Sequence, residues 1–141
     1  MRATSVSERN FKRKPVKRLV HYIPTVVVTC SIAYLSLLRE TGISLPLFFG
    51  WDKVVHFIMY FVLAAVMLMD TRRDKRQSRT AVIVIFVLCT IYGGVIEILQ
   101  ERFFYPRTGD WWDWAADSVG AAIGICVMLL LWNQQKKEGI S

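Results

Sequence analysis

The stretch TAVIVIFVLCTIYGGVIEIL, residues 80–99, decides the fold, because Glu97 is the only charged residue among its 20 positions. At a rise of about 1.5 Å per residue, a helix of this length reaches about 30 Å, which is the thickness of the hydrocarbon core of a bilayer. We therefore predict a transmembrane helix over residues 80–99. The adjacent Gly93 and Gly94 are expected to let a neighbouring helix approach closely.

Three further apolar runs flank this stretch, at residues 19–38, 54–69 and 114–132. Residues 39–51 are expected to form an interfacial loop and residues 70–79 a tight polar hairpin. The second run has only 16 residues, which leaves its helix little room for tilt.

The composition agrees with a membrane protein, since 54% of the residues are hydrophobic and 21% are charged. Apart from Glu97 and Asp117, the charged residues lie outside the four apolar runs, as expected when hydrocarbon excludes them. The sequence predicts an all-α fold, a four-transmembrane-helix bundle over residues 19–132. A basic tail at residues 1–18 precedes this membrane domain, and a short tail at residues 133–141 follows it.

The lysine and arginine residues are distributed unevenly between the two sides of the predicted bundle. Fourteen of the 18 lie in the N-terminal tail, the 70–79 hairpin and the C-terminal tail, which alternation of the spans places on one side. The positive-inside rule makes this side cytoplasmic, so both the N and C termini are predicted to be cytoplasmic. The expected location is the bacterial inner (cytoplasmic) membrane, with the lipid bilayer as a partner. The formal charge of +7 is then explained by basic residues that set the membrane topology and bind lipid headgroups. We therefore exclude nucleic acid as a partner.

Acidic residues concentrate on the opposite, outer side, which holds seven of the eleven. Asp52, His56 and Tyr60 follow one another at intervals of four, which places them on one face of a helix. Asp113 and Asp117 repeat this spacing. A charge at the bilayer midplane costs on the order of 3 kcal/mol, so these groups are expected to face the bundle interior or a water-filled vestibule.

Several of these residues also have structural explanations when each is taken alone. Asp52 and Asp113 would suit helix N-caps, and a hydrogen bond to Asp52 would account for His56. Glu97 is harder to explain, because it is a carboxylate inside a span with no Lys or Arg one turn before it, and it is the strongest single candidate. The aromatic residues are interpreted as an interfacial belt: Trp51, Phe103, Phe104, Tyr105, Trp111, Trp112, Trp114 and Trp132.

Small residues form a second pattern in the last span. Ala116, Gly120 and Gly124 are four residues apart, which predicts a stripe of close helix packing and a surface through which a homo-oligomer would form. The three cysteines lie inside apolar runs without CxxC spacing, so they are interpreted as buried apolar side chains.

Three motifs lie at the predicted helix ends. They are WDKVVHFIMY at residues 51–60, YGGVIEILQ at residues 92–100, and RTGDWWD at residues 107–113, which continues into ADSVG at residues 116–120 and Gly124. In these motifs the chain resembles the VanZ-like family of small bacterial membrane proteins, over about its last two-thirds. The family is named for a protein associated with resistance to the glycopeptide teicoplanin. The resemblance implies a four-helix membrane domain and a link to the cell envelope. Family members often carry Asn at the position of Asp117.

The spacing and the resemblance together define a candidate polar or ligand-binding cluster on the outer side. Its members are Asp52, Lys53, His56, Tyr60, Glu97, Gln100, Arg107, Asp110, Asp113 and Asp117. The candidate helix-packing residues are Gly93, Gly94, Ala116, Gly120 and Gly124.

Three classes of function fit this cluster. The leading hypothesis is a VanZ-like envelope protein that modulates teicoplanin susceptibility by binding a polar or lipid-linked ligand, such as a cell-wall precursor or the glycopeptide. The alternative is an intramembrane enzyme acting on a lipid headgroup through acid–base chemistry or a metal. His56, Glu97, Asp113 and Asp117 would suit Mg²⁺, Mn²⁺ or Ca²⁺ better than structural zinc. In the third class the cluster only ties helix ends together. Catalytic residues and cofactors stay unassigned.

Overall fold

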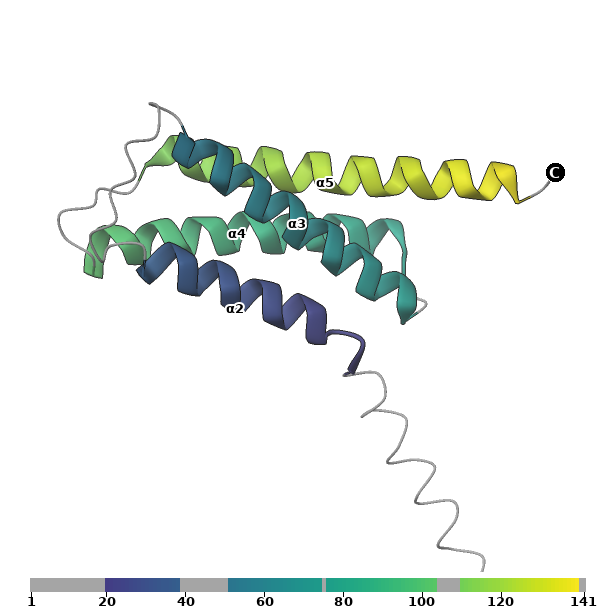
Figure 1. Cartoon of the computed structure of the whole chain (residues 1–141), viewed down its shortest axis with the longest axis horizontal. Helices are drawn as coiled ribbons and strands as arrows, with labels where there is room; N and C mark the ends of the chain where they lie inside the picture. Colours follow the sequence, from purple (N-terminus) through teal and green to yellow (C-terminus); the bar gives the residue numbers. More distant parts are fainter. Residues whose placement is uncertain (1–19, 39–50, 75, 104–109, 140–141) are drawn as a thin grey trace, which may run out of the picture.

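The computed structural model describes residues 20–38, 51–74, 76–103 and 110–139, which form the four helices of Figure 1. The helices are α2 (Ile23–Leu38), α3 (Trp51–Arg73), α4 (Arg79–Phe103) and α5 (Trp111–Glu138). Successive helices run in opposite directions, so α3 and α5 begin at the end of the bundle where α2 and α4 finish (Figure 1). The predicted all-α class and four-helix bundle are confirmed.

Three of the helices are long and apolar enough to cross a membrane, and α2 is a shorter apolar helix. Large apolar side chains face outward along the bundle, among them Ile83, Ile91 and Leu130, each more than half exposed. Exposure of such an apolar surface to water would be unfavourable, whereas in a bilayer the lipid chains solvate it. The described helices have the surface of a multi-pass membrane protein.

The helix boundaries differ from the predicted ones. α3 extends well beyond residues 54–69 at both ends, so the prediction of a short second span was wrong. Residues 70–73, predicted to belong to a hairpin, are its last helical turn. α4 and α5 are also longer than predicted, and α5 continues past Trp132 to Glu138. Arg72 and Arg73 keep a helical backbone while their side chains are exposed, and Asp70 is buried, so charge alone does not mark the boundary. Of the predicted loop at 39–51, residues 39–50 lie outside the described residues.

The central contact of the bundle is the packing of α5 against α3. Gly120 faces the carbonyl oxygen of Phe57, and a Cβ atom on Gly124 would lie 2.6 Å from that of Phe61. Only glycine allows the two backbones to approach so closely. The stripe predicted for helix packing therefore packs inside the chain. Because both glycines are buried against α3, they are not available to a second copy, and the predicted route to a homo-oligomer through them was wrong.

Polar contacts attach α2 to the rest of the bundle. Asp70, fully buried at the end of α3, accepts hydrogen bonds from the Thr25 hydroxyl at 2.7 Å and the Thr25 backbone N–H at 3.2 Å. This N–H belongs to the first turn of α2 and has no partner within its own helix, so Asp70 caps α2 from a neighbouring helix. At the middle of the bundle, the Tyr92 hydroxyl donates to the Thr29 carbonyl at 2.7 Å. No sequence pattern indicated a buried role for Asp70.

Candidate functional site

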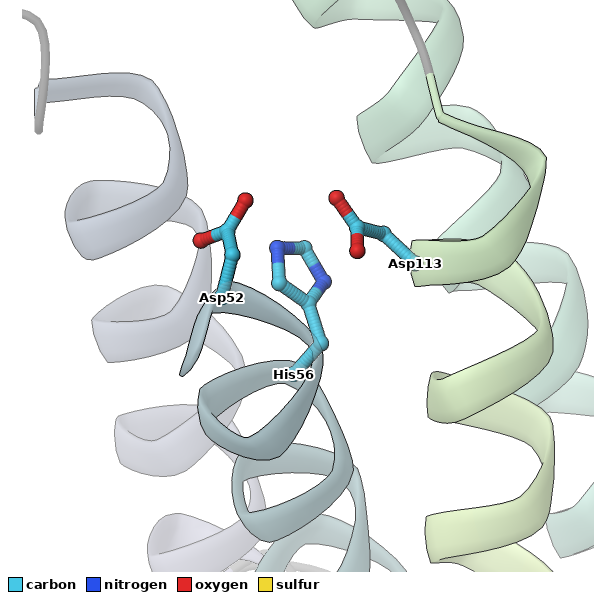
Figure 2. A group of neighbouring side chains, drawn as sticks. All are labelled: Asp52, His56 and Asp113. Atoms are coloured by element: carbon cyan, nitrogen blue, oxygen red, sulfur yellow. The ribbon is translucent and has the colours of Figure 1, made fainter. Parts of the chain in front are cut away.

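Ionisable side chains from three helices converge at the end of the bundle where α3 and α5 begin. Figure 2 shows the His56 imidazole between the carboxylates of Asp52 and Asp113. Asp52 and His56 are one turn apart on α3, and Asp113 comes from the first turn of α5. Asp52 and His56 were predicted to share a face of one helix, and in the structure this is the face of α3 that is directed toward Asp113 of α5.

His56 also contacts Asp117, which lies one turn after Asp113 on α5. The His56 Nδ1 atom lies 3.0 Å from Asp117 Oδ1, and both side chains are buried. A carboxylate oxygen only accepts, so the proton of this bond is assigned to Nδ1 and Nε2 points elsewhere. This bond links α3 to α5, and the predicted hydrogen bond from His56 to Asp52 stays a prediction, with ligand atoms of these two residues within 4.8 Å of each other.

Glu97 joins the same group from the last turns of α4. Its Oε1 atom lies 3.9 Å from His56 Nδ1, and its Oε2 atom accepts a hydrogen bond from the backbone N–H of Asp110 at 3.1 Å. Its residual exposure is 8%. Glu97 therefore faces the bundle interior and contacts both the buried histidine and the start of α5.

Gly93 creates the space in which the Asp117 carboxylate lies. A Cβ atom at Gly93 would be 2.7 Å from Asp117 Oδ2, closer than such atoms approach in real structures. Gly93 was predicted to allow a close approach, and the group that approaches it is the Asp117 side chain of α5. Gly94 faces the indole of Trp114, whose Nε1–H donates to the Thr90 carbonyl at 2.9 Å and attaches α5 to α4.

Lys53 connects two carboxylates at the rim of the cluster. Its ammonium donates to Asp110 Oδ2 at 2.7 Å and to Asp113 Oδ1 at 3.2 Å. The hydrogen bond from Lys53 lowers the pKa of the Asp110 carboxyl, and the bond from the Trp112 N–H adds to this effect. Asp110 is the N-cap of α5, accepting from Trp112 N–H at 2.9 Å, so the interpretation of Asp113 as the cap was wrong.

The remaining predicted site residues are placed differently. The Tyr60 side chain is buried next to Tyr92, and its hydroxyl has no hydrogen-bond partner in the described part of the chain. Gln100 donates to the Ser36 carbonyl at 2.9 Å, so it binds α2 and is turned away from His56. Arg107 lies outside the described residues.

An apolar groove of about 340 Å³ lies between α4 and α5 and was not anticipated from the sequence. The exposed side chains of Ile91, Val95 and Ile98 form one wall, and Trp111 and Trp114 form the other. At the end of α4, Glu97, Glu101 and Asp110 line it. The sequence pattern that could have indicated the groove is the helical spacing of Ile91, Gly94 or Val95, and Ile98. Every lipid-facing helix surface has the same pattern, so it does not identify a groove.

The cluster offers two groups of side chains with metal-binding geometry. In each group, one ligand atom per residue lies within 4.8 Å of the others. One group is Asp52, His56 and Asp113, and the other is His56, Glu97 and Asp117. The arrangement can therefore hydrogen-bond a polar ligand, exchange a proton through His56, or hold a cation.

Comparison with known proteins gives one family and a distant relative. The family model described as VanZ/LLP1 matches residues 2–132 of the chain. An uncharacterized protein of Schizosaccharomyces pombe is 26% identical over 89 residues, which are 63% of this chain and 52% of that protein. The chain thus spans about half the length of this curated relative. No solved structure matches the chain.

Proposed function

The chain belongs to the VanZ/LLP1 family, and from this premise we propose that it is a multi-pass membrane protein that binds a lipid-linked ligand. The polar end of the ligand would lie at the cluster of His56, Glu97 and Asp110, and its hydrocarbon chain in the groove between α4 and α5. The observation that carries this proposal is the continuity of the two features, because Glu97 and Asp110 line the groove and also belong to the cluster.

The shape and chemistry of the groove support a ligand with a chain and a polar end. Protein sites for small ligands are concave and mostly apolar, with a few polar groups that fix orientation. Here the apolar part follows α4 from Ile91 to Ile98, and the carboxylates of Glu97, Glu101 and Asp110 line the groove near the end of this helix. A lipid could enter sideways from the bilayer, because Ile91, Val95 and Ile98 are roughly half exposed along this face.

The polar end of the groove favours a headgroup that donates hydrogen bonds. Carboxylates of Glu97, Glu101 and Asp110 accept hydrogen bonds, so they suit amine or hydroxyl groups of a headgroup. Lys53 is bound to Asp110 and Asp113, so a phosphate next to the carboxylates would share this ammonium with them. A phospholipid with an amine or a lipid-linked sugar has this combination.

We further propose that the protein lies in the cell envelope and that its ligand affects glycopeptide susceptibility, as the resemblance to the teicoplanin-associated protein implies. A lipid-linked cell-wall precursor would be the ligand in that case. The cytoplasmic position of both termini is part of the proposal and places the cluster on the outer side.

Native mass spectrometry of the purified protein with defined lipids tests the proposal. Val95→Trp fills the groove, and Val84→Trp is the matched control, because both valines are exposed on α4 to a similar extent (45% and 48%) and only Val95 lines the groove. Lipid occupancy should fall with Val95→Trp and with Glu97→Gln, and stay unchanged with Val84→Trp. Equal occupancy in all variants would exclude the groove and the cluster as the binding site.

Acid–base catalysis on a lipid headgroup is the second candidate, and the His56–Asp117 contact favours it. A carboxylate that binds Nδ1 of a histidine orients the ring and stabilises its protonated form, which leaves Nε2 to exchange a proton. Thin-layer or mass analysis of lipids incubated with the protein would show a product that His56→Ala does not form. An unchanged lipid profile with native protein would remove this candidate and leave ligand binding intact.

A further inference from the structure

The side chains of His56, Glu97 and Asp117 form a buried group, and His56 and Glu97 also belong to the proposed lipid site. They come from α3, α4 and α5, and their exposed fractions are 2%, 8% and 0%. One ligand atom from each lies within 4.8 Å of the other two. Three charged or titratable groups at the same depth in a membrane protein are costly, so their convergence calls for a ligand or a structural reason.

The distances within the group suit a metal ion. His56 Nδ1 is 3.0 Å from Asp117 Oδ1 and 3.9 Å from Glu97 Oε1. An ion with bonds of about 2.1 Å holds adjacent ligand atoms about 3.0 Å apart in an octahedron and about 3.4 Å apart in a tetrahedron. The three atoms would therefore reach bonding positions with shifts of less than about 1 Å. A cation on Nδ1 would replace the proton of the bond to Asp117, and the neutral imidazole would then carry its proton on Nε2.

Asp117 supplies independent evidence for a ligand. Its side chain is fully buried, and its Oδ2 atom has no hydrogen-bond partner in the described structure. A buried carboxylate oxygen without a partner is destabilising, and a cation bound by both oxygens of Asp117 would satisfy it. Gly93 leaves this oxygen the room it occupies. Among the described residues, no Lys or Arg side chain pairs with His56 or Asp117.

The second group with metal-binding geometry is less suitable for an ion. Asp113 Oδ1 lies 3.2 Å from the Lys53 ammonium, so a cation already neutralises that carboxylate. Asp52 is partly exposed, whereas all members of the other group are buried. A metal ion would have to displace Lys53 or share Asp113 with it.

We propose that His56, Glu97 and Asp117 bind a divalent cation, with one imidazole nitrogen and carboxylate oxygens as its ligands. Mn²⁺ fits this donor set best, because Mg²⁺ and Ca²⁺ take oxygen ligands, and structural zinc sites favour thiolates and several histidines. The binding of the cation does not depend on the proposed lipid ligand.

Electron paramagnetic resonance with Mn²⁺ tests the site. The full chain, purified in lipid-free detergent with an affinity tag that contains no histidine, would be treated with chelator and titrated with Mn²⁺. We expect one bound Mn²⁺ per chain and, in pulsed spectra, coupling to a histidine nitrogen. His56→Phe and Glu97→Gln should each weaken binding by at least about tenfold, the minimum that loss of an outer-shell partner costs.

Asp52→Asn and Asp113→Asn are the matched controls, because they alter the other group and leave His56, Glu97 and Asp117 in place. Their Mn²⁺ affinity should stay within about twofold of the unmodified chain. The unmodified protein decides the proposal even where a variant fails to fold: no bound Mn²⁺, or bound Mn²⁺ without nitrogen coupling, overturns it. Loss of binding in Asp113→Asn with retention in Glu97→Gln would also overturn it. Failure of the lipid experiment would leave these results unaffected.

Discussion

His56 Nδ1 and Asp117 Oδ1 are 3.0 Å apart although 61 positions separate the two residues in the sequence. This buried contact joins α3 to α5 at the place where glycines bring the two backbones together. It is both a structural link and the centre of the proposed site, so the two roles have to be separated by experiment.

Substitution of His56 should destabilise the fold strongly when Asp117 is retained. His56→Leu leaves the Asp117 carboxylate buried without its partner, and loss of one member of a buried pair costs about 3–5 kcal/mol. The double variant His56→Leu with Asp117→Leu should recover part of this loss, because both polar groups are removed together. SDS titration of the purified protein would measure the free energy of unfolding. A double variant less stable than the single one would contradict the pairing.

Enlarging Gly120 should force α5 away from α3. The side chain of Gly120→Ala would meet the backbone carbonyl of Phe57, which cannot move as a side chain can. Overpacking of this kind costs about 1–3 kcal/mol. Gly139→Ala is the control, since its Cβ atom would only touch the Gln135 carbonyl at 3.4 Å. Equal unfolding free energies for the two variants would show that the close α3–α5 packing is absent.

Loss of the Asp70 side chain should loosen the start of α2. Asp70→Ala removes the acceptor for the Thr25 N–H and hydroxyl, and loss of a helix cap costs about 1 kcal/mol. Asp70→Asn keeps an acceptor oxygen and should cost less. Hydrogen exchange would follow the amides of the first turn of α2, which should exchange faster in Asp70→Ala than in Asp70→Asn. Unchanged exchange there would mean that another group caps α2.

Because of the Lys53–Asp110 contact, part of the free energy of unfolding should depend on pH. The pKa of Asp110 is lowered in the folded state from its ordinary value of 3.8, so its ionised form is favoured by folding. Its contribution is complete well above pH 3.8 and is lost as the pH falls through the lower folded value. The stability difference between the native protein and Asp110→Asn should therefore shrink in this acidic range.

Carboxyl NMR of Asp110 would measure its pKa directly. Lys53→Met should return the pKa toward 3.8, because the principal cause of the shift is the hydrogen bond from the ammonium. A pKa that stays low in Lys53→Met would assign the shift to the Trp112 N–H bond instead.

Several features of this chain follow from local sequence because hydrocarbon imposes a length and a composition on each span. The uncharged run before Glu97 is long enough to predict the helix that became α4, although its ends extend further. The spacing of Asp52 and His56 predicts that they share a face of α3, since helix periodicity is a local property. The N-cap of α5 was assigned to the wrong aspartate, because Asp110 and Asp113 are equally suitable by residue type and only the observed start of the helix separates them.

Other features depend on how each helix is rotated about its axis, which local periodicity does not specify. Gln100 is one turn from Glu97, yet it binds the Ser36 carbonyl of α2 while Glu97 lies near His56. Asp70 resembled an ordinary hairpin residue and proved to be buried as the cap of α2. The groove between α4 and α5 likewise combines residues of two helices, with Gly94 of α4 next to Trp114 of α5.

By itself, the sequence determined that this chain forms four apolar helices with acidic residues near one set of ends, because residue type controls partition into a bilayer. The tertiary structure alone decided which of those acidic residues meet. The pairing of His56 with Asp117, the entry of Glu97 and the space left by Gly93 result from packing between helices distant in the chain. Such packing depends on shape complementarity over whole helix faces, and no single stretch of sequence encodes it.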